Sequence, residues 1–358
     1  MRPILVIVFF LFILFSQAQE KIENVIVITT DGLRWQEVFG GMDSAIAGMK
    51  AYNQGDKTYI QQTYWADDIM ERRKKLMPFF WSTMAAGGNI YGNRKHGNFV
   101  NNANPYWFSY PGYNEIFTGY PDTAVNSNDY MPNPHVTILE YLHQLPKYNG
   151  KVAAFSAWDA FDRILNEKRA GFQVVSAFDS VAGKLNARQL LSNAMKRDSY
   201  RPFGSIECLD VFTHYNAFEY LKAHKPKVLY ISYGETDEWA HHGYYRSYLD
   251  AAHQVDQWVN NIWSFVQHDP VYRNKTALIF TTDHGRGDIK KTQWTDHGQS
   301  VADASEIWLA IMAPGLTGKG EIKVKEQWYQ KQIAQTIASI LGLTYAPKHP
   351  VGEPINLR

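Results

Sequence analysis

Five short apolar runs constrain the fold of this chain more than any other feature, because each run is continuous rather than alternating. They cover residues 24–30, 152–157, 227–233, 277–282 and 307–313. Continuous apolar runs of this length are typical of strands that are covered on both faces of a sheet. The sequence therefore predicts a central sheet buried between two layers.

Helical patterns lie between these runs, at residues 68–86, 136–145, 186–196, 210–223, 245–267 and 326–341. Strands that alternate with helices predict an α/β fold whose largely parallel central sheet is sandwiched between helices. No linker rich in Pro or Ser divides the chain, so we expect residues 19–358 to form a single domain. Residues 87–130 are dense in Asn, Gly, Pro and Tyr and predict a long loop region, which in a compact domain is usually functional.

The first residues predict export. A positive Arg2 precedes an apolar stretch at residues 3–15, and the small residues Ser16 and Ala18 follow at the spacing of a cleavage site. The stretch is shorter than the ~20 residues that a spanning helix needs. We therefore expect residues 1–18 to be a signal peptide, with an uncleaved anchor as the alternative. The mature chain would be periplasmic or extracellular and would carry no stable membrane anchor.

Charge and cysteine content limit the partners. The formal net charge is +1, which predicts no strong attraction to nucleic acid or to an anionic membrane. The single cysteine, Cys208, excludes an internal disulfide framework and a cysteine-based zinc cluster. No nucleic-acid partner is expected, and the small-molecule substrate that we do expect follows from the motifs below.

Three of the apolar runs are followed by candidate metal ligands. Asp31 follows the run at 24–30, Asp237 and His241 follow the run at 227–233, and Asp283 and His284 follow the run at 277–282. Open α/β sheets bind ligands beyond the carboxyl ends of their strands. A single Asp at such a place is typical of a turn, but three strand ends together favour a site.

The tetrapeptide Thr-Asp-His-Gly occurs twice, at 282–285 and at 295–298, and the second copy adds His297. Asp237 and His241 are four residues apart and share one face of a helical turn, whereas His242 would point about 100° away. Asp296, beside His297, could be a metal ligand, but we favour a role as a turn residue or as a hydrogen-bond partner of a ligand. Six candidate ligands result: Asp31, Asp237, His241, Asp283, His284 and His297.

This ligand set offers oxygen and imidazole nitrogen without thiolate, which suits zinc, with manganese as an alternative. Six ligands are enough for two divalent ions. Two ions roughly 4 Å apart can flank the attacking and leaving oxygens of an in-line displacement.

The segment SYPGYNEIFTG offers a nucleophile. Ser109 stands at the start of a predicted short helix that runs to Thr118 and ends at Gly119. The free N–H groups of a helix start favour anionic oxygens, and a nearby metal ion lowers the pKa of a hydroxyl. The alternative is an ordinary Ser N-cap.

These motifs together resemble the alkaline phosphatase superfamily, and most closely its nucleotide pyrophosphatase/type I phosphodiesterase branch. The similar segments are VIVITTDGLR, SYPGYNEIFTG, ISYGETDEWAHHG, TTDHG with the later His297, and QIAQTIASILGL. The resemblance covers most of residues 24–341. It implies an alkaline phosphatase-like catalytic domain with two metal ions, usually zinc.

The resemblance also implies roles. By analogy one ion is held by Asp237, His241 and His297, and the other by Asp31, Asp283 and His284, with Ser109 as a further ligand between them. Ser109 would attack a phosphoric ester and form a covalent phospho-enzyme. Asn128, with Asn126 as the alternative, and the Tyr110 N–H are expected to bind the phosphate oxygens.

Alternatives remain open. Formylglycine sulfatases of the superfamily carry an Arg where this chain has Tyr113, which argues against that maturation. Phosphoglycerate mutase-like phosphotransferases carry a large insert for which residues 114–227 are too short. Outside these classes, 11 Trp and 22 Tyr are compatible with a non-catalytic carbohydrate-binding protein.

Overall fold

The computed structural model describes residues 22–316 and 318–357. The predicted signal peptide at 1–18 lies outside the described residues. No helix among the described residues combines the length and apolarity that crossing a membrane requires.

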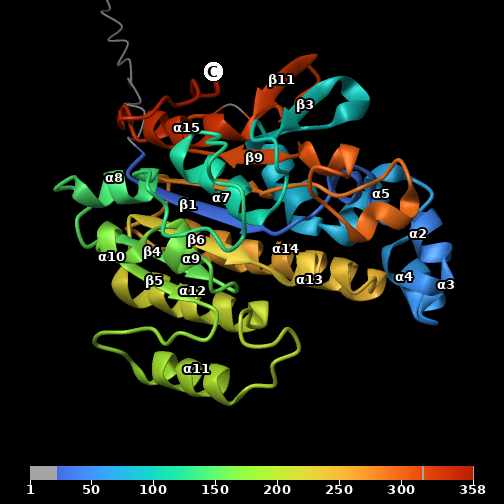
Figure 1. Cartoon of the computed structure of the whole chain (residues 1–358), viewed down its shortest axis with the longest axis horizontal. Helices are drawn as coiled ribbons and strands as arrows, with labels where there is room; N and C mark the ends of the chain where they lie inside the picture. The colour runs from blue at the N-terminus through green and yellow to red at the C-terminus, as the bar shows by residue number, and fades with distance from the viewer. Residues whose placement is uncertain (1–21, 317, 358) are drawn as a thin grey trace, which may run out of the picture.

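A mostly parallel sheet of eight strands forms the centre of the molecule (Figure 1). In spatial order its strands are β10 (Gly320–Glu321), β2 (Gly88–Tyr91), β9 (Leu309–Met312), β7 (Thr276–Thr281), β1 (Asn24–Thr30), β6 (Val228–Tyr233), β4 (Val152–Ser156) and β5 (Gln173–Ser176). Strand β9 runs antiparallel to both of its neighbours, and the other pairs are parallel. The predicted α/β sandwich with a largely parallel sheet is confirmed.

Alternate residues of the central strands feed two apolar clusters, one on each face of the sheet. In β1, Ile26 and Ile28 belong to one cluster and Val25 and Val27 to the other. This alternation follows from the two-residue period of a strand. Because both clusters are buried, every position of β1 is apolar or fully enclosed, as the continuous run predicts.

Helices cover both faces. The first cluster is covered by α1 (Trp35–Gly40), α2 (Ser44–Gly48), α3 (Lys50–Asn53), α4 (Lys57–Tyr64), α5 (Ile69–Leu76), α6 (Ala85–Gly87), α12 (Asp210–His224), α13 (Glu235–His241) and α14 (Tyr245–His268). The second is covered by α7 (Ser109–Thr118), α8 (Ile138–Gln144), α9 (Phe161–Ile164), α10 (Glu167–Ala170) and α15 (Ile333–Ile340). Helix α11 (Ala187–Asp198) contributes to neither cluster.

Three predicted elements differ from the structure. The helix expected at 68–86 breaks after Leu76, because Pro78 disfavours helical geometry in the residue before it. The strand expected at 307–313 is split at Trp308 into β8 (Glu306–Ile307) and β9. Residues 326–329, expected as helix, form β11 (Glu326–Tyr329), since they pair in parallel with β3 (Asn98–Asn101). Strands β11, β3 and β8 make a second, small sheet.

The region at 87–130 is more ordered than predicted. It contains β2, β3 and the predicted short helix α7, which ends at Gly119 with a left-handed φ of 66°. A glycine tolerates this conformation at no steric cost, so it ends the helix as predicted.

Candidate metal centre

Three neighbouring parallel strands bring the candidate ligands to one edge of the sheet. Strand β1 lies between β6 and β7 and is parallel to both. Asp31 directly follows β1, Asp283 and His284 follow β7, and α13 begins two residues after β6 ends. The predicted meeting of three strand ends is what the structure shows.

The first ligand group consists of Asp31, Asp283 and His284, all of which are buried. His284 Nε2 lies 3.2 Å from Asp31 Oδ1 and 3.5 Å from Asp283 Oδ2. One ligand atom from each residue falls within 4.8 Å of the other two, so the three side chains are close enough to share a cation. This group is the one that the resemblance assigns to one ion.

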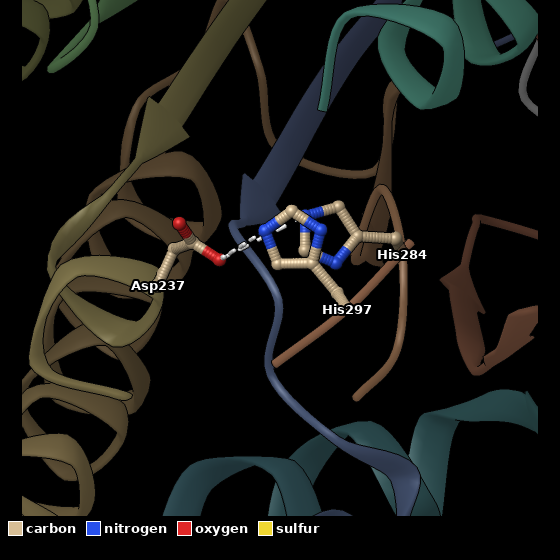
Figure 2. A group of neighbouring side chains, drawn as sticks. All are labelled: Asp237, His284 and His297. Carbon is tan, nitrogen blue, oxygen red and sulfur yellow. Dashed lines mark ion pairs between the residues drawn. The ribbon is translucent and has the colours of Figure 1, made fainter. Parts of the chain in front are cut away.

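The second group gathers around Asp237 on α13, and Figure 2 draws two of its members, Asp237 and His297. His297 Nε2 lies 3.7 Å from Asp237 Oδ1, and His241 Nε2 lies 3.1 Å from Asp237 Oδ2. The two imidazole nitrogens of His241 and His297 are 3.0 Å apart. All six predicted ligands therefore converge.

His284 lies between the two groups. Its Nε2 is 3.8 Å from Asp237 Oδ1, and its ring centroid is 4.1 Å from that of His297. Asp237, His284 and His297 accordingly form a compact trio as well (Figure 2). The predicted trio of Asp237, His241 and His297 differs from this one only in its third member, and the side chain of His241 is 40% exposed.

Asp31 is held in place by residues whose role the sequence did not indicate. The hydroxyl of Tyr113 donates to Asp31 Oδ2 at 2.9 Å, and Thr236 Oγ1 donates to the Asp31 carbonyl oxygen at 2.5 Å. Tyr113 is fully buried on α7, so one side chain connects the nucleophile helix to a ligand. Outer contacts of this kind orient metal ligands.

Arg286 is a buried cation that sequence reasoning missed. Its guanidinium pairs with Asp237 Oδ1 and donates to the carbonyl oxygens of Asp237 at 3.1 Å and Thr295 at 2.7 Å. The only sequence signal was its place one residue after the first Thr-Asp-His-Gly copy. Arg286 thus ties α13 to the loop that leads to His297.

Gly32 has no side chain, and the space beside its Cα is occupied by Arg286, Asp237 and His284. Its φ is +57°, and a Cβ at this position would lie 2.8 Å from Arg286 Nε, 2.8 Å from Asp237 Oδ1 and 3.1 Å from His284 Cε1. Its N–H donates to Asp283 Oδ1 at 3.1 Å. Any larger residue would fill the centre of the site.

The carboxylates are crowded enough to disturb their ionisation. Burial and the charge of Asp237 raise the pKa of Asp31, and burial and Asp31 raise the pKa of Asp283 well above its ordinary value. Burial opposes ionisation of Asp237 too, but Arg286 and His241 bring its pKa well below the usual range. Burial disfavours the charged form of His284, yet Asp283 and Asp31 raise its pKa to about 9.

These residues fit divalent cations. Asp31 Oδ1 and Asp283 Oδ2 are buried and share a single imidazole nitrogen, His284 Nε2, at 3.2 and 3.5 Å; Asp283 Oδ2 accepts no hydrogen bond within the described residues. A buried carboxylate oxygen without a donor is costly unless a cation is bound to it. The donor set of carboxylate oxygen and imidazole nitrogen suits zinc or manganese.

Ser109 is the first residue of α7, and Phe108 rather than Ser109 occupies the N-cap position. The alternative of an ordinary N-cap is therefore wrong. Ser109 Oγ lies 3.4 Å from His284 Nε2, so the hydroxyl adjoins the ligand shared by both groups. Gly112 allows this approach, because a Cβ there would lie 2.5 Å from the Asp283 carbonyl oxygen.

Asn128 and Tyr110, both expected to bind substrate, contact each other. The Tyr110 N–H donates to Asn128 Oδ1 at 2.9 Å. This backbone donor is therefore engaged by the amide oxygen rather than open toward the site. The Asn128 amide nitrogen is the group of this pair that can donate to a substrate oxygen.

The fold has an alkaline phosphatase-like architecture, and its candidate ligands form a site that can hold metal ions. Residues 212–345 match the family model of the metalloenzyme superfamily. A comparison with curated protein sequences gave no significant match.

Solved structures share this architecture. The alkaline phosphatase PafA aligns over 94% of this chain and 98% of its own, with 10% identity and a TM-score of 0.63. The lipoteichoic acid synthase LtaP from Listeria monocytogenes aligns over 90% of this chain and 72% of its own, with 12% identity and a TM-score of 0.54. A 2-O GAG sulfatase aligns over 91% and 72%, with 13% identity and a TM-score of 0.54.

At these identities the structural likeness establishes the fold. With the family-model match, it confirms the resemblance to the alkaline phosphatase superfamily, whose members include phosphatases and sulfatases. The type I phosphodiesterase branch remains a prediction from the sequence.

Proposed function

We propose that this chain is an exported two-metal hydrolase of phosphoric mono- or diesters that acts through a covalent phosphoserine at Ser109. The observation that carries this proposal is the position of the Ser109 hydroxyl, 3.4 Å from His284 Nε2 at the start of α7. A serine that neither caps its helix nor faces solvent, and whose hydroxyl contacts one of six converging candidate ligands, has the surroundings of a nucleophile.

The chain's residues divide into two binding groups. Asp31, Asp283 and His284 would hold one ion, and Asp237, His297 and His241 the other, with the Ser109 oxygen between them. When bound, two divalent ions, zinc in preference to manganese, supply the positive charge that favours the Ser109 alkoxide and offsets charge on the phosphoryl oxygens.

The first covalent step forms a bond between Ser109 Oγ and phosphorus and breaks the ester bond, so that the alcohol leaves. A water oxygen then bonds to phosphorus as the Oγ–phosphorus bond breaks, Ser109 Oγ regains a proton, and phosphate (or a monoester, from a diester) is released. The Asn128 amide nitrogen can donate to a phosphoryl oxygen, because Asn128 Oδ1 is already turned toward the Tyr110 N–H. The free N–H groups at the start of α7 favour the same negative charge.

A phosphoric ester is favoured over a sulfate ester by Tyr113. In the sulfatases, maturation of a formylglycine requires an Arg at this position of the motif. Here the Tyr113 hydroxyl is bonded to Asp31 Oδ2 at 2.9 Å, so the position serves to orient a ligand. The likeness to the alkaline phosphatase PafA and to LtaP is compatible with this choice.

The test is a kinetic panel on metal-loaded protein with p-nitrophenyl phosphate, bis-p-nitrophenyl phosphate and p-nitrophenyl sulfate, each with and without chelator. We expect chelator-sensitive turnover of a phosphate ester. Ser109→Ala should abolish turnover and trapping of phospho-enzyme while metal content is unchanged, and Ser264→Ala, at an exposed position on α14, should behave as wild type. Turnover of the sulfate alone, or glycan binding without any turnover, would refute the proposal.

Export is tested separately. We expect the mature chain to begin near Gln19 and to be recovered outside the cytoplasm. N-terminal sequencing of the purified protein after cell fractionation decides this, and an intact residue 1 on cytoplasmic protein would contradict it.

A further inference from the structure

We propose that helix α11 docks this protein on the surface of an anionic lipid membrane. The inference is independent of the proposed hydrolase activity, because it rests on a part of the chain remote from the metal ligands in sequence. Figure 1 shows α11 at the outer edge of the molecule, beyond α12.

The burial pattern of helix α11 is the reverse of that of an ordinary surface helix. Its apolar side chains Leu190, Leu191 and Met195 are 57%, 61% and 56% exposed. Its buried positions are polar, namely Gln189, Ser192, Asn193 and Lys196. A surface helix normally does the reverse and buries its apolar stripe. We call Leu190, Leu191 and Met195 the outer face of α11.

Specific hydrogen bonds fix this orientation. Ser192 Oγ donates to Asn216 Oδ1 on α12 at 2.5 Å. Asn193 bonds the backbone of Val181 twice, from its amide nitrogen and to its amide oxygen, both at 3.0 Å. Asn186 begins the helix with a reciprocal capping box. Since polar contacts hold the inner side of α11, its apolar side is committed to solvent or to a partner.

The charge around α11 differs from that of the whole chain. Residues 182–202 contain five basic residues and one acidic residue, whereas the complete chain has a formal net charge of only +1. Lys184, Arg188, Arg197 and Arg201 are exposed, and two of them also pair with carboxylates, Arg188 with Glu219 at 3.6 Å and Arg197 with Asp198 at 3.2 Å. The net charge of the whole chain predicts no strong attraction to an anionic membrane. The excess of basic residues around α11 does predict such an attraction, because basic side chains beside an apolar helix face are typical of membrane-surface helices.

The area of the outer face favours a lipid surface over a second copy of the chain. A helix of 12 residues is about 18 Å long. A stable protein–protein interface buries on the order of 800 Å² on each partner, which one face of so short a helix does not supply. Insertion of three apolar side chains into the headgroup region needs no such area.

The experiment is vesicle co-sedimentation of the metal-loaded mature chain from Gln19 onward, so that the apolar residues before it do not contribute. Vesicles of phosphatidylcholine alone are compared with vesicles that contain about 30% phosphatidylglycerol. We expect binding to the anionic vesicles that weakens with salt. Replacing Leu190, Leu191 and Met195 together by Gln should lower the partition coefficient at least tenfold.

A matched control replaces three other exposed apolar residues, Met131, Ile289 and Val324, by Gln and should bind as wild type. Circular dichroism and thermal melting check that both triple variants are folded. Equal binding of wild type and the α11 variant, no preference for anionic vesicles, or a concentration-dependent dimer that the α11 variant loses would each overturn the proposal. The last result would assign the outer face to a second copy.

Discussion

The backbone N–H of Gly298 donates to the carbonyl oxygen of Trp107 at 3.0 Å. This bond joins the residue after His297 to the residue two places before Ser109. Trp107 adopts φ 53°, a left-handed conformation that is unusual for a bulky residue and that marks a constrained backbone. The second Thr-Asp-His-Gly copy therefore supplies more than an imidazole, because it also fixes the approach of the nucleophile segment.

Replacing His241 by Ala should release one ion more readily than the other, because His241 contacts Asp237 and His297 and not the first ligand group. Elemental analysis after dialysis against limiting chelator measures this. His242→Ala is the matched control, since His242 is the next residue, is exposed, and is not one of the six ligands. Equal loss of both ions would contradict the division into two groups.

Tyr113→Phe should weaken metal binding by about 10- to 100-fold, because it removes the hydrogen bond that orients Asp31. The variant keeps the ring and therefore its packing against Phe161. A competition titration with a chromogenic chelator gives the affinity. Tyr110→Phe, on the same helix but bonded to the Met131 carbonyl oxygen, provides the comparison, and equal affinities in the two variants would disprove the role.

Gly112→Ala should lower kcat at least about 100-fold, since a misplacement near 1 Å has this effect and the new Cβ would clash with the Asp283 carbonyl oxygen at 2.5 Å. Helix α7 would be pushed away from the ligands and carry Ser109 with it. Steady-state kinetics on the preferred ester measure the change. Gly48→Ala, where a Cβ meets no atom within 4 Å, should leave kcat unaltered, and a comparable loss in both variants would argue against this mechanism.

His214 predicts a pH dependence of stability. Burial and the charge of Lys222 lower its pKa from the ordinary histidine value of 6.5 to about 3. The unfolded chain thus takes up a proton below about pH 6.5 that the folded chain refuses, so stability present at higher pH is lost as the pH falls from 6.5 toward 3. At pH 5 the loss is about 2 kcal/mol.

Urea unfolding between about pH 5 and 8, with chelator present so that metal release does not contribute, measures this loss. His214→Gln should flatten the slope by that amount, although it will lower stability at all pH values because His214 stacks on Trp258. His268→Gln, at an exposed position, should keep the wild-type slope. A His214→Gln variant with an unchanged slope would show that another group is responsible.

The sequence was most informative where chain order alone decides the outcome. Asp31, Asp283 and the start of α13 follow adjacent parallel strands, so their meeting could be predicted from strand ends. Helix α7 could be predicted because Gly119 ends it. The small sheet could not, since β11 is a strand only through its pairing with β3, which is distant in the sequence.

The supporting residues of the site were also beyond sequence reasoning. Tyr113 and Arg286 act through contacts with Asp31 and Asp237 that no spacing rule reveals. The engagement of Tyr110 N–H by Asn128 likewise depends on how an irregular loop returns to α7. Local patterns named the ligands, whereas tertiary packing decides how each is oriented.

The position of the His284 imidazole between the Asp31–Asp283 pair and Asp237 has a consequence for assembly of the centre. One imidazole nitrogen coordinates one ion at a time. The ion that binds first therefore determines which group His284 Nε2 belongs to, and the second ion is coordinated by the other ligands. Loading should therefore be sequential, with unequal affinities arising from one side chain that lies within reach of both positions.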